Sequence, residues 1–283
     1  MDAILIHLSM GSINGWFSGF NSVSRFSKVV AVHNFMNILF VLAHNDDEYF
    51  CALRMQEEIR LGNHVFIAYL TYGGIQAENP DVRISESIKV LRKFGIDETS
   101  ILLIGRRKSI FDLHLHERSV DACQDLNELL KNTAIKRTYV MAWEGGHPDH
   151  DASHMIGVAF ARKRNLQSQI YEFPAYSRFR VMTPLQTSSA LLATKTSRMD
   201  ALKTLASGFS YKTQRGTFIA MLPGSIAQLL VFGYQNYWRV PDERNYRNPP
   251  HAGRLFYERR FNISFQEFSK NLRALGSLVS GDP

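Results

Sequence analysis

The sequence contains little cysteine: Cys51 and Cys123 are the only two among 283 residues. A disulfide scaffold, a cysteine-rich zinc knuckle and an iron–sulfur cluster all need more thiols, so these classes are excluded. Two cysteines in a chain of this length also favour a reducing compartment, and we predict a cytoplasmic location. Any metal site in the chain must then use nitrogen and oxygen ligands.

Several signatures of other functions are missing as well. No G-x-G-x-x-G follows the first predicted strand and no G-x-x-x-x-G-K-[ST] occurs, so the chain does not resemble a dinucleotide-binding or P-loop protein. There is no zinc-finger spacing and no aromatic RNA-binding signature, so we predict no nucleic-acid partner. The 33 Lys and Arg exceed the 26 Asp and Glu, and the net charge of +7 favours anionic partners without identifying one.

Long apolar runs are also scarce. Residues 1–36 are mildly apolar, are interrupted by three glycines and begin without a basic region, so they fit neither a signal peptide nor a spanning helix. The apolar run at residues 226–234 is too short to span a membrane. We therefore predict a soluble chain with no spanning membrane segment, and its oligomeric state stays open.

What the sequence does contain is a regular alternation of strands and helices. Hydrophobic residues make up 45% of the chain, which is enough to bury a full core. The pattern predicts strands at residues 38–43, 65–70, 101–104 and 138–143, followed in turn by helices at residues 48–61, 85–94, 117–130 and 150–164. Apolar strands interleaved with helices are typical of a parallel sheet covered on both faces. A Rossmann-like three-layer α/β domain with a mostly parallel sheet is the simplest such topology.

We divide the chain into three regions on this basis. Residues 1–36 are an N-terminal extension, residues 37–175 a Rossmann-like metal-binding catalytic core, and residues 176–283 a C-terminal subdomain packed on the core. The alternation fades in this last region. There the pattern predicts a helix at 195–206, a strand at 218–222, a helix at 225–232 and a loop at 241–251.

Two loops of the predicted core combine histidine with aspartate. Residues 44–48, HNDDE, follow the first strand, and residues 144–150, EGGHPDH, follow the fourth. The carboxyl ends of parallel strands lie at one edge of a sheet, so the two loops can meet there. A catalytic zinc is held by three protein ligands with one open position. His44, Asp47 and His150 could supply these ligands.

The other polar side chains of these loops suggest catalytic roles. Asp46 could act as the general base that takes the proton of an attacking water. His147 is placed to stabilise an oxyanion or to protonate a leaving amine, and Asp149 could fix the tautomer of an imidazole by a hydrogen bond. Either loop alone is often only a helix start, because aspartate caps free amides there. Both loops at one sheet edge favour a site.

The same residues resemble a known family. Residues 43–48, AHNDDE, are similar to the A-H-P-D-D-E signature of the PIG-L/LmbE-like N-acetylglucosaminyl deacetylases, and residues 147–150, HPDH, are similar to their second signature. Weaker similarities lie at residues 71–74, 83–86 and 211–214. The resemblance covers about residues 37–215 and is specific in its two metal motifs.

The resemblance implies a zinc-dependent hydrolase that removes the acetyl group from an N-acetylglucosamine-type sugar unit in a glycoconjugate, releasing acetate and a free amine. It implies the same three ligands and the same two catalytic residues, and it adds Arg83 as a substrate contact. Asn45 stands where the family usually has proline, and we expect it to take the same tight turn and to bond its own backbone. Members that act on the glycolipid precursor of GPI anchors carry an N-terminal spanning helix, which we do not predict here.

Two other interpretations remain open. Two histidines and one carboxylate also form the facial triad of iron(II) oxygenases, and a non-catalytic sugar-binding protein could retain the same fold. The adjacent Asp46 favours hydrolysis, because an oxygenase has no use for that carboxylate. The predicted cofactor is Zn²⁺, with Fe²⁺ as the alternative at the same ligands.

Overall fold

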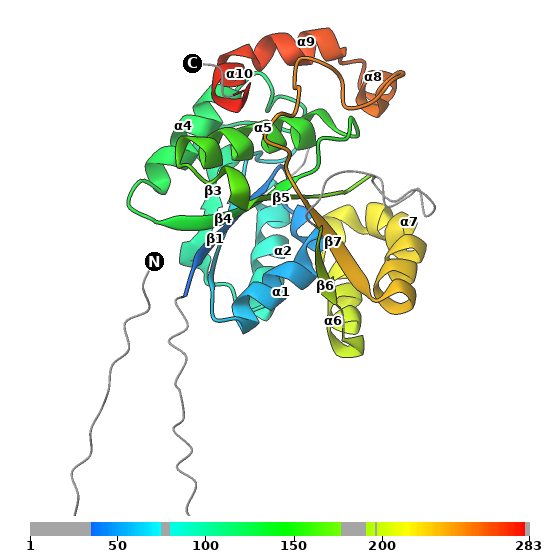
Figure 1. Cartoon of the computed structure of the whole chain (residues 1–283). Helices are drawn as coiled ribbons and strands as arrows, with labels where there is room; N and C mark the ends of the chain where they lie inside the picture. The colour runs from blue at the N-terminus through cyan, green and yellow to red at the C-terminus, as the bar shows by residue number, and fades with distance from the viewer. Residues whose placement is uncertain (1–34, 75–79, 177–190, 196, 281–283) are drawn as a thin grey trace, which may run out of the picture. The chain divides into compact units, whose positions relative to one another are not determined.

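A computed structural model of the chain describes residues 35–74, 80–176, 191–195 and 197–280 (Figure 1). The predicted N-terminal extension lies outside these residues, except for its last two positions. From residue 34 onward the chain forms one compact unit. The boundary that we predict at residue 175 stays a prediction.

A seven-stranded sheet forms the centre of this unit, with the strand order β3-β2-β1-β4-β5-β7-β6. The strands are β1 (Asn37–Leu42), β2 (His64–Tyr69), β3 (Ile101–Leu103), β4 (Ile135–Met141), β5 (Ile170–Phe173), β6 (Leu191–Lys195) and β7 (Tyr234–Arg239). The first five strands pair in parallel, whereas β7 is antiparallel to both β5 and β6. The predicted α/β fold with a mostly parallel sheet is confirmed.

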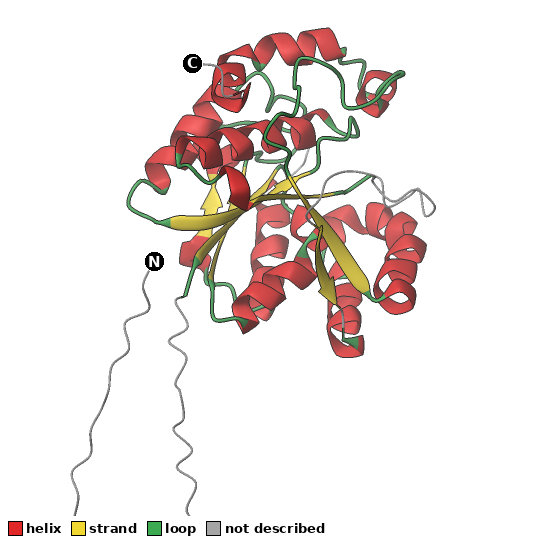
Figure 2. Cartoon of the chain, in the orientation of Figure 1, coloured by secondary structure: helices red, strands yellow, loops and turns green. Residues whose placement is uncertain are grey.

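Helices cover both faces of the sheet (Figure 2). They are α1 (Ala52–Arg60), α2 (Pro80–Lys93), α3 (Ile104–Lys108), α4 (Ser119–Leu129), α5 (Pro148–Lys163), α6 (Arg198–Gly208), α7 (Arg215–Ile226), α8 (Phe256–Arg260), α9 (Phe265–Asn271) and α10 (Arg273–Ser280). The four helices predicted in the core correspond to α1, α2, α4 and α5. The chain also forms two short 3-10 helices, η1 (Asp47–Phe50) and η5 (Lys212–Gln214), and a π-helix, η6 (Ala227–Phe232).

The alternation of side chains along β1 explains why this strand is apolar throughout. Phe40 packs with Met55 of α1 on one face of the sheet. Val41 packs with Ile156 of α5 on the other face. Successive side chains of a strand point to opposite faces, so a strand covered on both sides is apolar at every position.

Helix α5 approaches the sheet unusually closely at Gly157. A Cβ atom at this position would lie 2.4 Å from Cγ1 of Val140 and 3.3 Å from Cβ of Val41. No side chain larger than hydrogen fits there without a shift. The contact seats α5 against β1 and β4, and it thereby fixes the start of the helix near the ends of these two strands.

The C-terminal region departs from the prediction at several elements. Residues 218–222, predicted as a strand, lie inside α7. The predicted helix at 195–206 begins three residues later, because β6 extends to Lys195. Strands β5, β6 and β7 were not predicted. Short apolar runs do not distinguish a strand from a helix by their period, which explains the error at 218–222.

One helix in the described part of the chain, Lys212–Phe232, is long and apolar enough to cross a membrane by length and composition alone. It combines η5, α7 and η6. The run at residues 226–234 belongs to a longer uncharged stretch, because residues 216–238 contain no charged side chain. Met221 and Leu229 of this helix are nevertheless buried against the rest of the unit.

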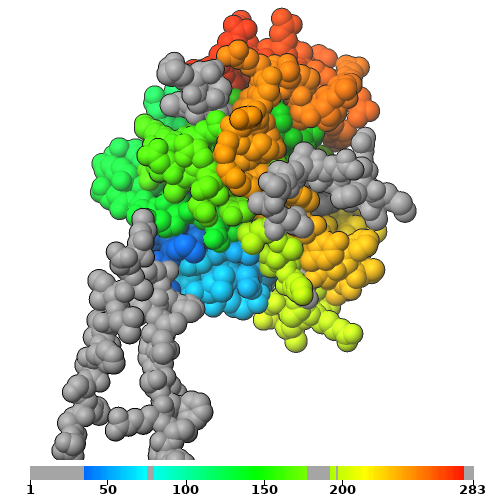
Figure 3. All heavy atoms as spheres, in the orientation of Figure 1, coloured from blue at the N-terminus to red at the C-terminus, as the bar shows by residue number. Residues whose placement is uncertain are grey.

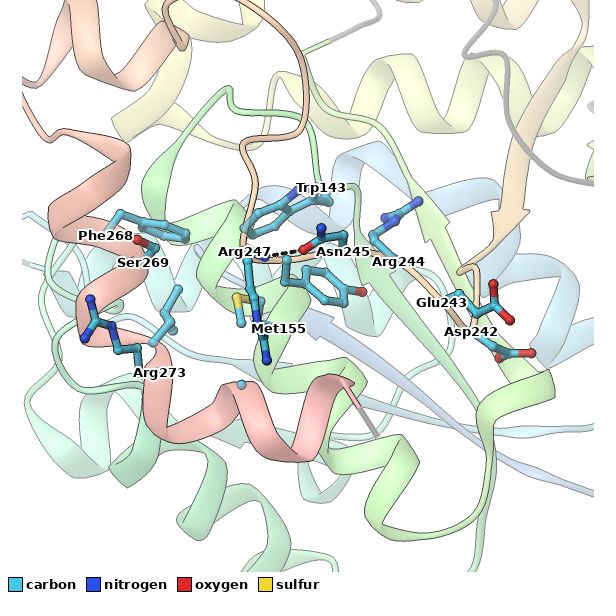
Figure 4. A pocket seen from close by; sticks show the side chains of 13 residues that line it. Trp143, Met155, Asp242, Glu243, Arg244, Asn245, Arg247, Phe268, Ser269 and Arg273 are labelled. Carbon is cyan, nitrogen blue, oxygen red and sulfur yellow. Dashed lines mark hydrogen bonds between the residues drawn. The ribbon is translucent and has the colours of Figure 1, made fainter. Parts of the chain in front are cut away.

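Helices α9 and α10 lie over α5 and border a cavity of about 890 Å³ (Figure 4). Trp143, Met155 and Phe268 belong to its lining. Tyr246 lies in the same lining, and its hydroxyl is 2.8 Å from Nε2 of the buried His154. Because Nδ1 of His154 donates to the carbonyl of Met141, Nε2 must accept from the tyrosine. His154 is thus a neutral core histidine.

Candidate metal centre

The two predicted loops meet at the ends of β1 and β4. These strands are neighbours in the sheet, and from them the chain continues toward opposite edges, to β2 on one side and to β5 on the other. Such a reversal of strand order is where open α/β sheets commonly bind ligands, because the loops diverge there. The fold therefore places both histidine–aspartate loops at one position.

The three predicted ligands converge at this position. Nδ1 of His44 lies 3.2 Å from Nε2 of His150, which lies 3.2 Å from Oδ1 of Asp47. Nδ1 of His44 is 3.4 Å from Oδ2 of Asp47, and all three residues are buried. A tetrahedral cation with ligands at about 2.1 Å holds its donors about 3.4 Å apart. The donor set therefore fits a divalent metal ion.

A tight turn after β1 directs the two aspartates apart. The amide of Asp47 donates to the carbonyl of His44 at 3.2 Å, and the amide of His44 donates to Oδ2 of Asp47 at 2.7 Å. Asp46 between them has a φ of 113°, a left-handed conformation that is rare outside glycine. Asp47 thus faces the histidines, whereas the side chain of Asp46 points elsewhere from the same turn.

Asn45 takes the tight turn, as we expected, but it does not bond its own backbone. Its Oδ1 is buried and has no hydrogen-bond partner among the described residues. The turn is held instead through the Asn45 carbonyl, which accepts from Nε of Arg83 at 2.7 Å. A proline at this position would keep that carbonyl, so the substitution leaves the bond to Arg83 in place.

The start of α5 supplies the second loop. His147 caps the helix, with its Nδ1 accepting from the amide of Asp149 at 3.2 Å, and Pro148 occupies the first turn. Proline suits this position because the amide it lacks would be unpaired there. The next turn of the helix presents His150 to His44.

Asp149 contacts His44 on the side away from the other two ligands. Its Oδ2 lies 3.1 Å from Nε2 of His44 and accepts from the amide of Leu113. Burial opposes ionisation, but the hydrogen bonds from His44 and the backbone lower the pKa of Asp149 to about 2. An ionised carboxylate only accepts, so Nε2 of His44 carries the proton and Nδ1 is left as the donor for a metal.

Asp46 is held by an arginine in a buried environment. Nη2 of Arg83 lies 2.7 Å from Oδ1 of Asp46, and Nη1 lies 3.0 Å from Oδ2 of Asp112. Burial raises the pKa of Asp46 to about 6, although the positive charge of Arg83 opposes this shift. The side chain of Arg83 is 14% exposed, so its guanidinium is largely committed to these two carboxylates.

His147 is neutral in this environment. Burial, followed by the nearby His44, holds its pKa well below the usual range of histidine. Since Nδ1 accepts from the amide of Asp149, the single proton of the neutral ring lies on Nε2. His147 can therefore donate one hydrogen bond from Nε2.

Two residues at the centre were not predicted from the sequence. Asp112, which pairs with Arg83, lies in the loop after α3, 4.0 Å from Nε2 of His44. The ring of Tyr176 lies 5.5 Å from that of His150. From the sequence, Asp112 could have been identified as a candidate site residue only because it lies beyond the third predicted strand. Tyr176 follows β5, a strand that the pattern did not reveal.

Comparisons with known proteins identify the family. Residues 39–161 match the family model described as PIG-L, GlcNAc-PI de-N-acetylase. The match includes both histidine–aspartate loops. The chain therefore carries a PIG-L domain over these residues, and the predicted family is confirmed. A search of curated proteins gave no match.

Solved structures share the fold at low sequence identity. The A40926 pseudoaglycone deacetylase Dbv21 is 14% identical with a TM-score of 0.57, over 71% of this chain and 96% of that one. A zinc-inhibited form of the teicoplanin deacetylase Orf2 is 11% identical with a TM-score of 0.57, over 72% and 97%. The conserved protein TT1542 from Thermus thermophilus is 16% identical with a TM-score of 0.53, over 77% and 100%.

Proposed function

We propose that this chain is a metal-dependent hydrolase that removes the acetyl group from an N-acetylglucosamine-type sugar unit in a glycoconjugate. The observation that carries the proposal is the buried trio His44, Asp47 and His150 beside Asp46, a carboxyl group with a pKa raised to about 6. The family model and the names of two structural neighbours, which are deacetylases, support this reaction. An iron(II) oxygenase or a non-catalytic protein would have no use for Asp46.

The proposed ligands are nitrogen and oxygen donors suited to Zn²⁺, with Fe²⁺ as the alternative. When bound, the metal ion would polarise the amide carbonyl and acidify a water molecule. Asp46 takes the proton of the attacking water on Oδ2, because Oδ1 is engaged by Arg83. A pKa near neutrality suits this transfer, since the carboxylate is ionised at pH 7 yet holds a proton well.

His147 and the proton on Asp46 complete the reaction. The Nε2–H of His147 donates to the oxyanion that forms as water attacks the carbonyl. Because its pKa is lowered, His147 is better suited to this electrostatic role than to donating a proton. The proton held by Asp46 passes to the leaving amine, and acetate and a free amine result. Arg83 orients Asp46 and is proposed to contact the substrate at its exposed edge.

We also propose a reducing, cytoplasmic location for the enzyme. Cys51 and Cys123 are both buried free thiols. Burial raises the pKa of Cys123 to about 11, so this thiol stays protonated and unreactive.

Replacing the proposed base tests the function. In Asp46→Asn we expect the metal content and the fold to be retained and acetate release to fall by about 10²- to 10⁴-fold, the usual contribution of a general base. Acetate release is measured for the purified chain against a panel of N-acetylglucosaminyl conjugates, with metal content determined alongside. The matched control is Asp121→Asn, an exposed aspartate paired with Arg118.

Two results would count against the proposal. Normal turnover by Asp46→Asn would remove Asp46 as the base. A wild-type protein that binds no stoichiometric divalent metal would overturn the whole scheme.

A further inference from the structure

Exposed apolar side chains gather on one part of the molecule. Thirteen large apolar residues are exposed in the described chain, and nine of them lie between residues 199 and 234. These nine lie in α6, α7 and η6, except for Phe209 directly after α6 and Tyr234 at the start of β7, and we call them together the apolar surface. Val231 is 74% exposed and Phe209 63%. Exposed apolar residues of a monomeric protein are usually scattered, so such a cluster indicates an interaction site.

The apolar surface follows the periodicity of its helices. Met199, Leu202 and Phe209 repeat along one face of α6, and Ile219 and Leu230 lie on one face of the helix formed by α7 and η6. The space-filling view shows both helices on the outer side of the unit (Figure 3). The two faces are therefore presented outward.

The helix of α7 and η6 is apolar on its inner face as well. There Leu229 packs with Leu205 of α6 and with Leu53 of α1. Yet only 17% of the most apolar stretch of Lys212–Phe232 is buried. A helix that is apolar on all sides belongs either in a core or in contact with lipid, and this one is not a core helix.

Basic residues lie on the same helices as the apolar surface. Between residues 191 and 240 the sequence has six lysines and arginines and a single acidic residue, Asp200. Asp200 is itself paired with Arg60 at 3.4 Å. Arg198, Lys203 and Arg215 are exposed on α6 and at the start of α7. Apolar side chains bordered by lysine and arginine suit the surface of a bilayer with anionic lipids.

Aromatic contacts between the helix Lys212–Phe232 and the catalytic unit favour contact with the bilayer surface over a transmembrane span. The ring of Phe218 stacks on Tyr211 at 4.8 Å and meets Tyr49 at 4.9 Å. The hydroxyl of Tyr211 donates to Glu48 in the loop of the metal centre at 2.7 Å. A helix that crossed the membrane would have to give up these contacts. We propose that the apolar surface docks on the face of a membrane containing anionic lipids.

The proposal goes beyond the deacetylase reaction and does not depend on it. It is tested by flotation of the full chain with vesicles of phosphatidylcholine, with and without phosphatidylserine. We expect binding to the anionic vesicles, weaker binding to the neutral ones, and a loss of binding as salt is raised. Val231→Ser combined with Phe232→Ser should weaken the partition into anionic vesicles at least tenfold. The matched control is Leu61→Ser combined with Val82→Ser, two exposed apolar residues elsewhere.

A second pair of variants tests the electrostatic part. Lys203→Glu combined with Arg215→Glu should reduce binding to anionic vesicles at least tenfold, whereas Lys136→Glu on β4 should not. Circular dichroism and metal content, unchanged in every variant, show that a loss of binding is not a loss of fold. These readouts also separate failure of the docking proposal from failure of the proposed function.

Several outcomes would overturn the proposal. These are absence of binding to anionic vesicles, equal binding to neutral vesicles, and unchanged binding by the variants of Val231 and Phe232. A dimer by light scattering that these two substitutions convert to a monomer would assign the apolar surface to a second copy of the chain. Resistance of the vesicle-bound protein to alkaline carbonate extraction would indicate a spanning helix.

Discussion

The orientation of His44 depends on a single carboxylate. Asp149 accepts from Nε2 of His44 and also from the backbone amides of Leu113 and Leu115, so each of its oxygens has a donor. This arrangement leaves Nδ1 of His44 facing His150. A carboxylate that holds the far nitrogen of a metal-ligating histidine fixes its tautomer and raises its basicity.

Replacing this carboxylate by an amide should weaken metal binding. In Asp149→Asn one oxygen becomes an NH₂ group, which faces a donor and cannot accept from it. We expect the metal affinity to fall about 10- to 100-fold, the usual effect of removing such a partner. Competition with a chelator measures the affinity, and Asp121→Asn serves as the surface control. An unchanged affinity would show that Asp149 does not set the orientation of His44.

The sequence alone locates the proposed ligands because each lies in a short loop directly after a predicted strand. The geometry of Arg83 could not be predicted in this way. Its partners Asp46 and Asp112 are 37 and 29 residues away in the chain, and only the packing of α2 beside both loops brings them together. Glu86, three residues after Arg83 on α2, does not pair with it and accepts from the backbone amides of Lys212 and Thr213.

The C-terminal region supports the loop that carries the proposed base. Glu48 is fully buried, and its Oε2 accepts from the strained amide of Asp46 at 2.8 Å. Its Oε1 accepts from the hydroxyl of Tyr211, which lies between α6 and α7. At residues 211–214, Tyr211 thus supports η1 and the two following residues bond to Glu86 of α2.

Removal of the Tyr211 hydroxyl should disturb both stability and catalysis. Tyr211→Phe leaves a buried oxygen of Glu48 without its donor, which costs about 1 to 3 kcal/mol of unfolding free energy. We expect kcat to fall several-fold with KM little changed. The substitution loosens the conformation of Asp46 but leaves the contacts with the substrate unchanged. Urea unfolding and steady-state kinetics measure the two effects.

The control for this substitution is Tyr171→Phe on β5, where the ring is half-buried and the hydroxyl bonds to none of the described residues. A Tyr211→Phe protein with wild-type kcat would show that the bond to Glu48 does not position Asp46.

The C-terminal elements that the sequence did not reveal lack a clear period. Helix α2 buries one side and exposes Lys89, Arg92 and Lys93 on the other, so its period identifies it. Helix α7 lacks a charged residue after Arg215 and was taken in part for a strand. Strand β5 has four residues, too few for any period to show.

Buried neutral histidines make the stability of the protein depend on pH. His154 donates to the Met141 carbonyl and accepts from Tyr246, so its neutral form satisfies both ring nitrogens. Burial, followed by the nearby charge of Arg244, holds the pKa of His154 well below its usual range. In the unfolded chain the same imidazole has its ordinary pKa of about 6.5. Below that pH the unfolded chain therefore binds a proton that the folded chain does not.

The sign of the effect follows from this difference. The contribution of His154 to the free energy of unfolding is fully present above about pH 6.5. It decreases as the pH falls toward the pKa of His154 in the folded protein, by at most about 1.4 kcal/mol per pH unit. Urea unfolding at pH 7.5 and 5.5 measures it. His154→Gln should be less stable at pH 7.5 but should lose about 1 kcal/mol less between the two pH values. His114→Gln, at an exposed histidine, is the control. Burial also lowers the pKa values of His116 and His147, but these residues are the same in all three proteins and cancel in the comparison. An equal loss in the wild type and in His154→Gln would show that His154 does not cause the acid sensitivity.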